Sequence, residues 1–158
     1  MHTLERAPNR WTNDQHEPRL GAFEGAFSEV NLADWKAVQD LPWLRRKMRH
    51  KRWFYTSVAT PEVFLASAMV NAGIATSMFI YAVDLVREEL LFEQRYMGGP
   101  GPTVSLNNKP GAGFKSRALL PGVSAQCTRP TESDPYTLNI NAFSVKNWKG
   151  QRLQARLN

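Results

Sequence analysis

Residues 51–96 read KRWFYTSVATPEVFLASAMVNAGIATSMFIYAVDLVREELLFEQRY, and this stretch holds most of the large apolar side chains of the 158-residue chain. Within it, residues 63–83 form a run of 21 positions without a single charge. A run of this length is either one helix that spans a membrane or two strands of a buried sheet. The fold therefore depends on whether a turn divides the run.

The membrane-helix interpretation has two supports. About 20 apolar residues suffice to cross the hydrocarbon core of a bilayer, and Val63–Val83 has that length. A basic cluster also lies upstream, as the positive-inside rule requires of a cytoplasmic flank. Its six members are Arg45, Arg46, Lys47, Arg49, Lys51 and Arg52.

The hairpin interpretation explains more of the sequence. Asn71-Ala72-Gly73 divides the run, and Asn and Gly tolerate the backbone conformations of a tight turn. The flanking segments 63–70 and 74–83 have the length of strands, and residues 52–58 are rich in aromatic and β-branched side chains. An Asn at the centre of a bilayer would also be costly without a partner. We therefore expect antiparallel strands here and keep the single span as the alternative.

The rest of the chain predicts an all-β fold, an antiparallel barrel or half-barrel with one short helix and a polar N-terminal arm. Short strands separated by turn signals are typical of this class. We expect an extended arm over 1–20 and a β domain over 21–158. A helix is expected to start at Asp40-Leu41-Pro42, with Asp40 as its N-cap. Further strands are expected at 21–27, 84–96, 114–120, 122–129, 136–145 and 151–157, and a turn-rich segment at 103–113. In the 84–96 strand, Val86, Leu90, Phe92 and Tyr96 have the same parity and are expected to share one face.

Charge and cysteine content limit the classes of function. Six of the 20 basic residues lie between Arg45 and Arg52 with no acid among them, so the other 14 balance the 14 acidic residues. The net charge of +6 is thus one local patch. The single cysteine, Cys127, allows no intrachain disulfide and no cysteine-based zinc site, which suits the cytoplasm. The three histidines are far apart in the sequence, so we expect no metal site and no cofactor.

Two groups of side chains are candidates for binding. An aromatic group is expected to line an apolar pocket of the barrel, although ordinary core packing explains it equally well. It consists of Trp53, Tyr55, Phe79 and Tyr81. A basic group is a candidate for anion binding, with a solvated helix face as the alternative. It consists of Arg45, Arg46, Lys47 and Arg49.

One acid is a candidate for catalysis. Asp84 ends the long apolar strand, and inside a barrel it could have a raised pKa and act as a general acid. We favour the simpler role of a turn residue at a strand end. The Gly- and Pro-rich segment 98–102 lacks the Gly-Lys-Ser/Thr of a phosphate loop, and no nucleophile motif is present. The sequence leaves open whether a reaction is catalysed.

Several of these segments resemble the N-terminal half of the DUF2804 family. The resemblance is carried by Lys51-Arg52-Trp53-Phe54-Tyr55 with the strands that run to Asp84, by Gly21, Gly25 and Asn31, and by NNKPGAGFKSRALLPG at 107–122. It covers roughly residues 18–158. The resemblance implies a lipocalin-like barrel, similar to the two-lobed barrels of carotenoid hydratase-type and AttH-type proteins. It also implies a protein about twice this long, of which this chain would be the first part.

The favoured function is the binding of an apolar small molecule or lipid, in line with the expected barrel and its aromatic lining. One alternative is a single-span membrane protein with Val63–Val83 as the span, which is less favoured than a soluble protein. The other is binding of nucleic acid or an anionic surface through Arg45–Arg52, and of these partners nucleic acid is not expected.

Overall fold

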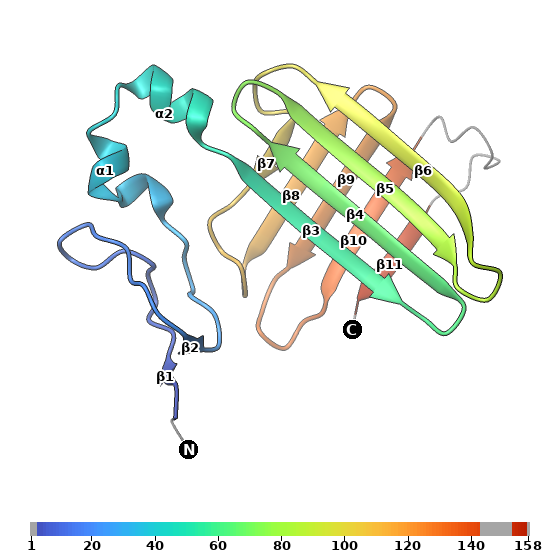
Figure 1. Ribbon diagram of the computed structural model, residues 1–158, viewed down its shortest axis with the longest axis horizontal. Coiled ribbons are helices and arrows are strands. Elements are labelled where there is room, and N and C mark those ends of the chain that lie inside the picture. Colours follow the sequence, from blue (N-terminus) through green and yellow to red (C-terminus); the bar gives the residue numbers. More distant parts are fainter. Residues whose placement is uncertain (1–2, 143–152, 158) are drawn as a thin grey trace.

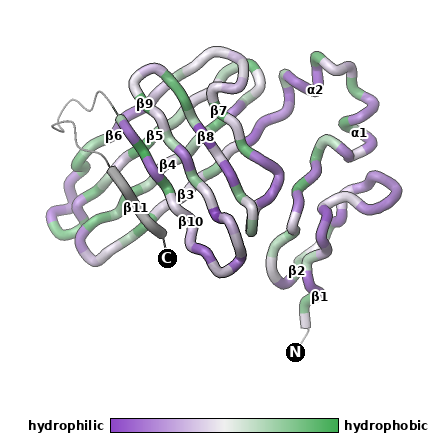
Figure 2. The backbone as a smooth tube through the Cα atoms, turned by 180° about the vertical axis from the view of Figure 1, so that it is seen from behind, coloured by the Kyte–Doolittle hydropathy of each residue, from purple (hydrophilic) through white to green (hydrophobic). Residues whose placement is uncertain are grey.

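Two antiparallel sheets pack face to face, and a separate N-terminal segment lies beside them (Figure 1). The structure is a computed structural model that describes residues 3–142 and 153–157. Figure 2 views the molecule from behind, with the five-stranded sheet nearest the viewer. The predicted all-β class is confirmed, because both sheets of the body are antiparallel and strands make up most of its regular structure.

The N-terminal segment contains only short elements. They are β1 (Glu5–Arg6), which pairs in parallel with β2 (Phe23–Glu24), the 3-10 helix η1 (Leu32–Asp34), α1 (Lys36–Gln39) and α2 (Trp43–Arg49). The predicted helix exists as α2, but the expected cap is wrong: Pro42 occupies the N-cap position and Asp40 ends α1 instead. Pro42 has an extended conformation, with ψ at 140°, so the chain cannot be helical through it.

The four-stranded sheet has the order β3-β4-β5-β6. Its strands are β3 (Arg52–Ala59), β4 (Val63–Asn71), β5 (Thr76–Asp84) and β6 (Glu89–Gly98). The predicted hairpin is therefore confirmed, and the single-span alternative is wrong because Val63–Val83 forms two paired strands. Asn71 makes the turn in the expected way: its Oδ1 accepts a 2.9 Å hydrogen bond from the N–H of Gly73, whose φ is +82°. Among the described residues, no helix has the length and apolar character needed to cross a bilayer.

The five-stranded sheet has the order β11-β10-β9-β8-β7. Its strands are β7 (Val104–Leu106), β8 (Phe114–Leu120), β9 (Val123–Arg129), β10 (Tyr136–Ala142) and β11 (Leu153–Leu157). Sequence patterns predicted all of these strands except β7, which lies inside the segment expected to be turns. The end of the expected 136–145 strand, from 143 onward, falls outside the described residues.

One predicted face is partly wrong. Val86, Leu90, Phe92 and Tyr96 were expected to share one face of a strand over 84–96. Residues 85–88 instead form a turn, and a register shift at Ala82/Val83 places Leu90 opposite Val83 on the outer face. Phe92 and Tyr96 do face inward. The extra residue of the bulge reverses the alternation, which a strict period of two cannot represent.

The inward faces of the two sheets form the core. Met69 of β4 lies opposite Met78 of β5 in the ladder, and both side chains are fully buried. They pack with Ile80 and Tyr96 of their own sheet against the facing sheet. The facing residues are Val104, Leu106, Phe114, Ala118, Leu120, Val123, Ala125, Cys127, Leu138 and Ile140.

Side-chain hydrogen bonds join the sheets at the corner where β3 and β4 meet β7. The two sheets share no backbone ladder in the described part of the chain. Instead, Asn71 Nδ2 donates to the Val104 carbonyl at 2.7 Å, and an Arg52 terminal nitrogen donates to the Leu106 carbonyl at 2.9 Å. Val104 and Leu106 lie two residues apart, so their carbonyls point to the same edge of β7. Polar side chains thus take the place of a neighbouring strand there.

We predict that Met69→Ala lowers the free energy of unfolding by about 2–5 kcal/mol, because it leaves a cavity between the sheets. Urea denaturation monitored by circular dichroism measures this loss. The matched control is Met97→Ala on β6, whose side chain is 66 % exposed and should cost less than about 0.5 kcal/mol. Equal losses in the two variants would contradict the assignment of the core face.

Candidate functional site

Two pockets adjoin at Arg52, the first residue of β3. The apolar pocket has a volume of about 280 Å³ and the polar pocket about 400 Å³. They share His50, Arg52 and Leu106. The apolar pocket is further lined by Val30, Leu32, Trp53, Phe54, Asn107, Asn108, Lys109, Pro110 and Phe114. The polar pocket is further lined by Lys47, Asn71, Gly73, Gly101, Pro102, Val104 and Ser105.

Strand alternation turns Arg52 toward the facing sheet. Exposure alternates along β3, so Arg52 shares the inward parity with Phe54, Thr56 and Val58. Its Nε donates to His50 Nε2 at 3.1 Å, and one terminal nitrogen donates to the Leu106 carbonyl. Burial lowers the pKa of the guanidinium, but an arginine stays charged at neutral pH. The other terminal nitrogen has no hydrogen bond within the described part of the chain, so Arg52 presents a charged donor to the pockets.

His50 is neutral beside this charge. Burial lowers the pKa of its imidazole, and the positive charge of Arg52 lowers that pKa further. The hydrogen bond with Arg52 also indicates a neutral ring, because an Nε2 that accepts a hydrogen bond carries no proton of its own. The imidazole proton is therefore on Nδ1. His50 fixes the guanidinium without adding a second charge to the site.

Aromatic rings form the floor of the apolar pocket. The ring centroids of Phe54 on β3 and Phe114 on β8 lie 4.6 Å apart. Tyr136, at the start of β10, lies 5.7 Å from Phe114 and 6.4 Å from Phe54. The rings come from both sheets; Phe54 and Phe114 line the pocket, and Tyr136 packs against them. Their contact surface is apolar and lies directly beside the Arg52 charge.

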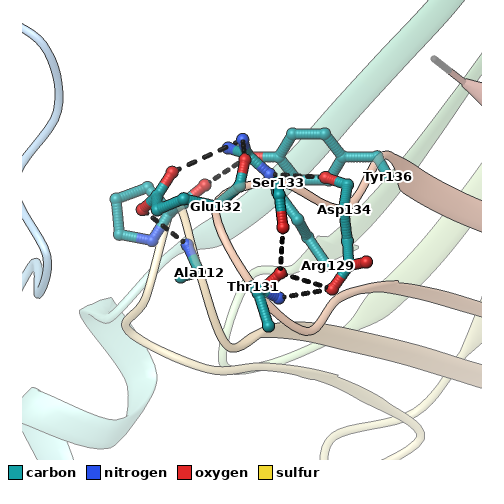
Figure 3. A network of polar contacts seen from close by, with 8 residues as sticks. Ala112, Arg129, Thr131, Glu132, Ser133, Asp134 and Tyr136 are labelled. Carbon is teal, nitrogen blue, oxygen red and sulfur yellow. Dashed lines mark hydrogen bonds and ion pairs between the residues drawn. The ribbon is translucent and has the colours of Figure 1, made fainter.

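The 107–110 loop forms one wall, and a polar network supports it from behind (Figure 3). Arg129 donates to the carbonyls of Glu132 at 2.7 Å and Asp134 at 3.0 Å, and its guanidinium lies 5.1 Å from the centre of the Tyr136 ring. The Tyr136 hydroxyl donates to the Pro110 carbonyl. Glu132 Oε1 accepts the N–H of Ala112 at 3.2 Å. The β9–β10 turn therefore holds the loop in position.

The N-terminal segment supplies a neighbouring wall through Val30 and Leu32. The N–H of Val30 donates to the Asn108 carbonyl at 2.7 Å, which ties the two walls together. Between them, buried Asn31 donates to Thr12 Oγ1 and to Asp34 Oδ2, each at 2.7 Å. These contacts make the segment part of the site.

The charged side chains that line the two pockets are all basic. Arg52 and Lys109 face the apolar pocket and Lys47 faces the polar one, while neither lining contains an Asp or Glu. Such a site favours a ligand with an apolar body and a negatively charged group. It lacks the ligand set for a metal ion, and no group of three or more His, Cys, Asp or Glu side chains that could hold one occurs in the described residues.

The four aromatic candidates lie together, but on the outer face of the four-stranded sheet. In the ladder Tyr55 and Phe79 flank Ala68, with ring centroids 6.5 Å apart, and Phe79 stacks on Tyr81 at 6.3 Å. Hydrogen bonding with Tyr55 raises the pKa of Tyr81, so their hydroxyls meet across β4. Trp53 stands at the end of this face, 69 % exposed, and also borders the apolar pocket. Their predicted role in ligand binding stays a prediction.

The other candidates have separate places. Asp84 forms the β5–β6 turn: its Oδ1 accepts the N–H groups of Val86 at 3.0 Å and Arg87 at 2.9 Å. This is the favoured turn role, and Asp84 lines neither pocket. The basic candidates Arg45, Arg46, Lys47 and Arg49 are all exposed on α2, and of these only Lys47 reaches a pocket. Catalysis by Asp84 and anion binding by these four stay predictions.

Sequence reasoning missed Arg52 and His50 as site residues. Arg52 was counted only as part of the basic patch, and His50 only as an isolated histidine. The parity of β3 carried a usable signal, because Arg52 is the one charge in phase with Phe54, Thr56 and Val58. A charge on the apolar parity of a strand is either paired or functional.

We predict that Arg52→Gln raises the pKa of His50 toward 6.5, because it removes the neighbouring positive charge. Imidazole resonances followed by NMR against pH measure this shift, and Arg117→Gln, on the far side of the sandwich, is the control. In the unmodified protein the unfolded chain binds the His50 proton more readily than the folded one. The contribution of His50 to stability is therefore complete above pH 6.5 and declines as the pH falls through 6.5 toward the lowered pKa. An unchanged His50 pKa in Arg52→Gln would contradict the described contact.

Comparison with known proteins identifies the family. A family model described as a domain of unknown function, DUF2804, matches residues 17–158. No curated protein and no solved structure matches the chain. The matched range includes every residue that lines either pocket, and it covers most of the chain. The chain therefore belongs to the DUF2804 family.

Proposed function

We propose that this protein binds a small apolar molecule that carries an acidic group, with the apolar body in the apolar pocket and the acid on Arg52. The observation that carries the proposal is the position of Arg52. Its guanidinium lies between an aromatic floor and a polar pocket, and His50 and the Leu106 carbonyl fix its orientation.

The physical contributions favour this class of ligand over a wholly apolar one. A hydrogen bond to a charged group contributes about 1.5–3 kcal/mol, and the guanidinium offers a carboxylate the fork geometry that suits two parallel bonds. Lys109 adds a second positive charge at the rim. Contact with Phe54 and Phe114 contributes about 25 cal/mol for each Å² of apolar surface removed from water.

The size of the site points to a compact ligand. At about 280 Å³ the apolar pocket is near the small end of the range for ligand sites. A fused aromatic acid or a short branched fatty acid suits it better than a long lipid chain. The unpaired Cys127, which is fully buried, is compatible with the cytoplasm as the expected compartment of such a protein.

We predict that 2-naphthoate binds at least tenfold more tightly than 2-naphthamide, which has the same shape and no charge. Isothermal titration calorimetry measures both affinities. Arg52→Gln should abolish the preference for the acid, whereas Arg117→Gln should retain it. Arg52→Lys keeps the charge but loses the fork, and should retain an intermediate preference.

Two results would overturn the proposal. One is equal affinity of the two ligands for the unmodified protein, and the other is the absence of binding by either. A preference that survives in Arg52→Gln would move the acid-binding role to another residue.

A further inference from the structure

Apolar side chains and positive charges gather at the end of the molecule that carries α2. We propose that this end docks onto the surface of an anionic lipid bilayer. We call it the α2 end and define it by the whole of α2, by Ile74 in the β4–β5 turn, and by Trp53 and Met97 at the ends of β3 and β6. The proposal requires no ligand in the Arg52 site, although Trp53 and Lys47 also line its two pockets.

Backbone contacts place these residues together. A Cβ added at Gly73 would meet the carbonyl oxygens of Lys47 at 2.4 Å and Met48 at 2.8 Å, so the β4–β5 turn lies directly against α2. Ile74 follows in the same turn. Trp53, Val70, Ser77 and Met97 face outward in one row across the sheet, one residue from that turn. The helix, the turn and this row therefore share one end of the sheet (Figure 1).

None of the seven residues of α2 is buried. Trp43 is 67 % exposed, and Leu44 and Met48, one helical turn apart, are 51 % and 47 % exposed. Ile74 is 58 % exposed beside them. A helix of two turns is marginal without a packed face. Some other surface must cover these side chains for the helix to gain the usual stability from burial.

Charge determines which surface fits. Arg45, Arg46 and Arg49 are exposed on α2, Lys51 follows it, and no ion pair of theirs occurs in the described part of the chain. An anionic leaflet attracts each such residue by about 1 kcal/mol. Aromatic and aliphatic side chains between the cations are the composition of helices that lie at the membrane interface.

Two other partners fit less well. Nucleic acid would pair with the arginines but would leave Leu44, Met48 and Ile74 exposed to water. A second copy docked through this end would bring like charges together, which is unfavourable. A bilayer accommodates both features, since arginine side chains can reach the headgroups while the apolar groups insert.

A second basic surface on the same chain provides a matched control. Lys115 and Arg117 lie on the outer face of β8 within a depression of about 290 Å³, among Ser124, Gln126, Asn139 and Asn141. This surface has exposed cations but no aromatic or large aliphatic side chain in the depression. It separates the effect of charge alone from that of charge combined with apolar insertion.

The test is co-sedimentation with vesicles of phosphatidylcholine containing 30 % phosphatidylserine, compared with phosphatidylcholine alone. We predict binding to the anionic vesicles only. Arg45→Gln combined with Arg46→Gln should weaken it about 30-fold, at roughly fivefold per charge. Lys115→Gln combined with Arg117→Gln removes the same number of charges and should change it less than about twofold.

The apolar contribution needs its own variant. Leu44→Ser combined with Met48→Ser should weaken vesicle binding by about tenfold or more, and both side chains are exposed enough that the fold should persist. Leu119→Ser, at an exposed leucine of β8, is its control. Three results would overturn the proposal: equal loss in test and control variants, no binding to anionic vesicles, or tighter binding to duplex DNA than to vesicles in the same buffer.

Discussion

Arg52 and Asn71 join the two sheets through side-chain hydrogen bonds at a corner where the strands of the two sheets do not pair. The candidate site depends on this junction. Their side chains donate to the carbonyls of Leu106 and Val104 on the edge of β7. The same end of the four-stranded sheet carries Thr76, whose hydroxyl contacts that of Thr103 at 2.6 Å. The inward face of the sheet is thus apolar along the core and polar in its last row. The change from one to the other produces an apolar pocket beside a fixed positive charge.

The two outer faces of the sandwich differ in polarity. An antiparallel sheet with one face in water is normally polar on that face. The outer face of the five-stranded sheet follows this rule, with Lys115, Arg117 and several amides. On the four-stranded sheet the outward positions are mostly aromatic or aliphatic, and the charged pair Glu93–Arg95 neutralises itself at 2.7 Å on the edge strand. Such a face is characteristic of an interaction surface.

The sequence predicted those parts of the fold that local chemistry determines. Asn71 and Gly73 specify their turn without help from distant residues, so the hairpin and the sheet around it followed from the residue types. The bulge at Ala82/Val83 has no such signature, and it reversed the predicted face of Leu90. The short strand β7 could not be recognised among turn residues, because its three residues are held by pairing with β8.

The site was less predictable, since its walls come from residues 30–32, 50–54 and 106–114. Of the aromatic candidates, Tyr55, Phe79 and Tyr81 contact one another, on the outer face of the four-stranded sheet. Parity alone does not say which face of a sheet is covered by a second sheet. Here the covering sheet is built from strands that come later in the chain, β7 to β11. The residue that organises the site, Arg52, was visible in the sequence only as a charge in phase with apolar neighbours.

The most direct test of this account is to locate the bound acid. Side-chain NMR of the arginine Nε–H groups during a titration with 2-naphthoate reports which guanidinium meets it. We predict that the Arg52 resonance shifts together with the backbone amides of Trp53, Leu106 and Asn108, while that of Arg117 stays in place. Shifts confined to Phe79, Tyr81 and Arg95 would contradict it, because they would place the ligand on the outer face of the four-stranded sheet.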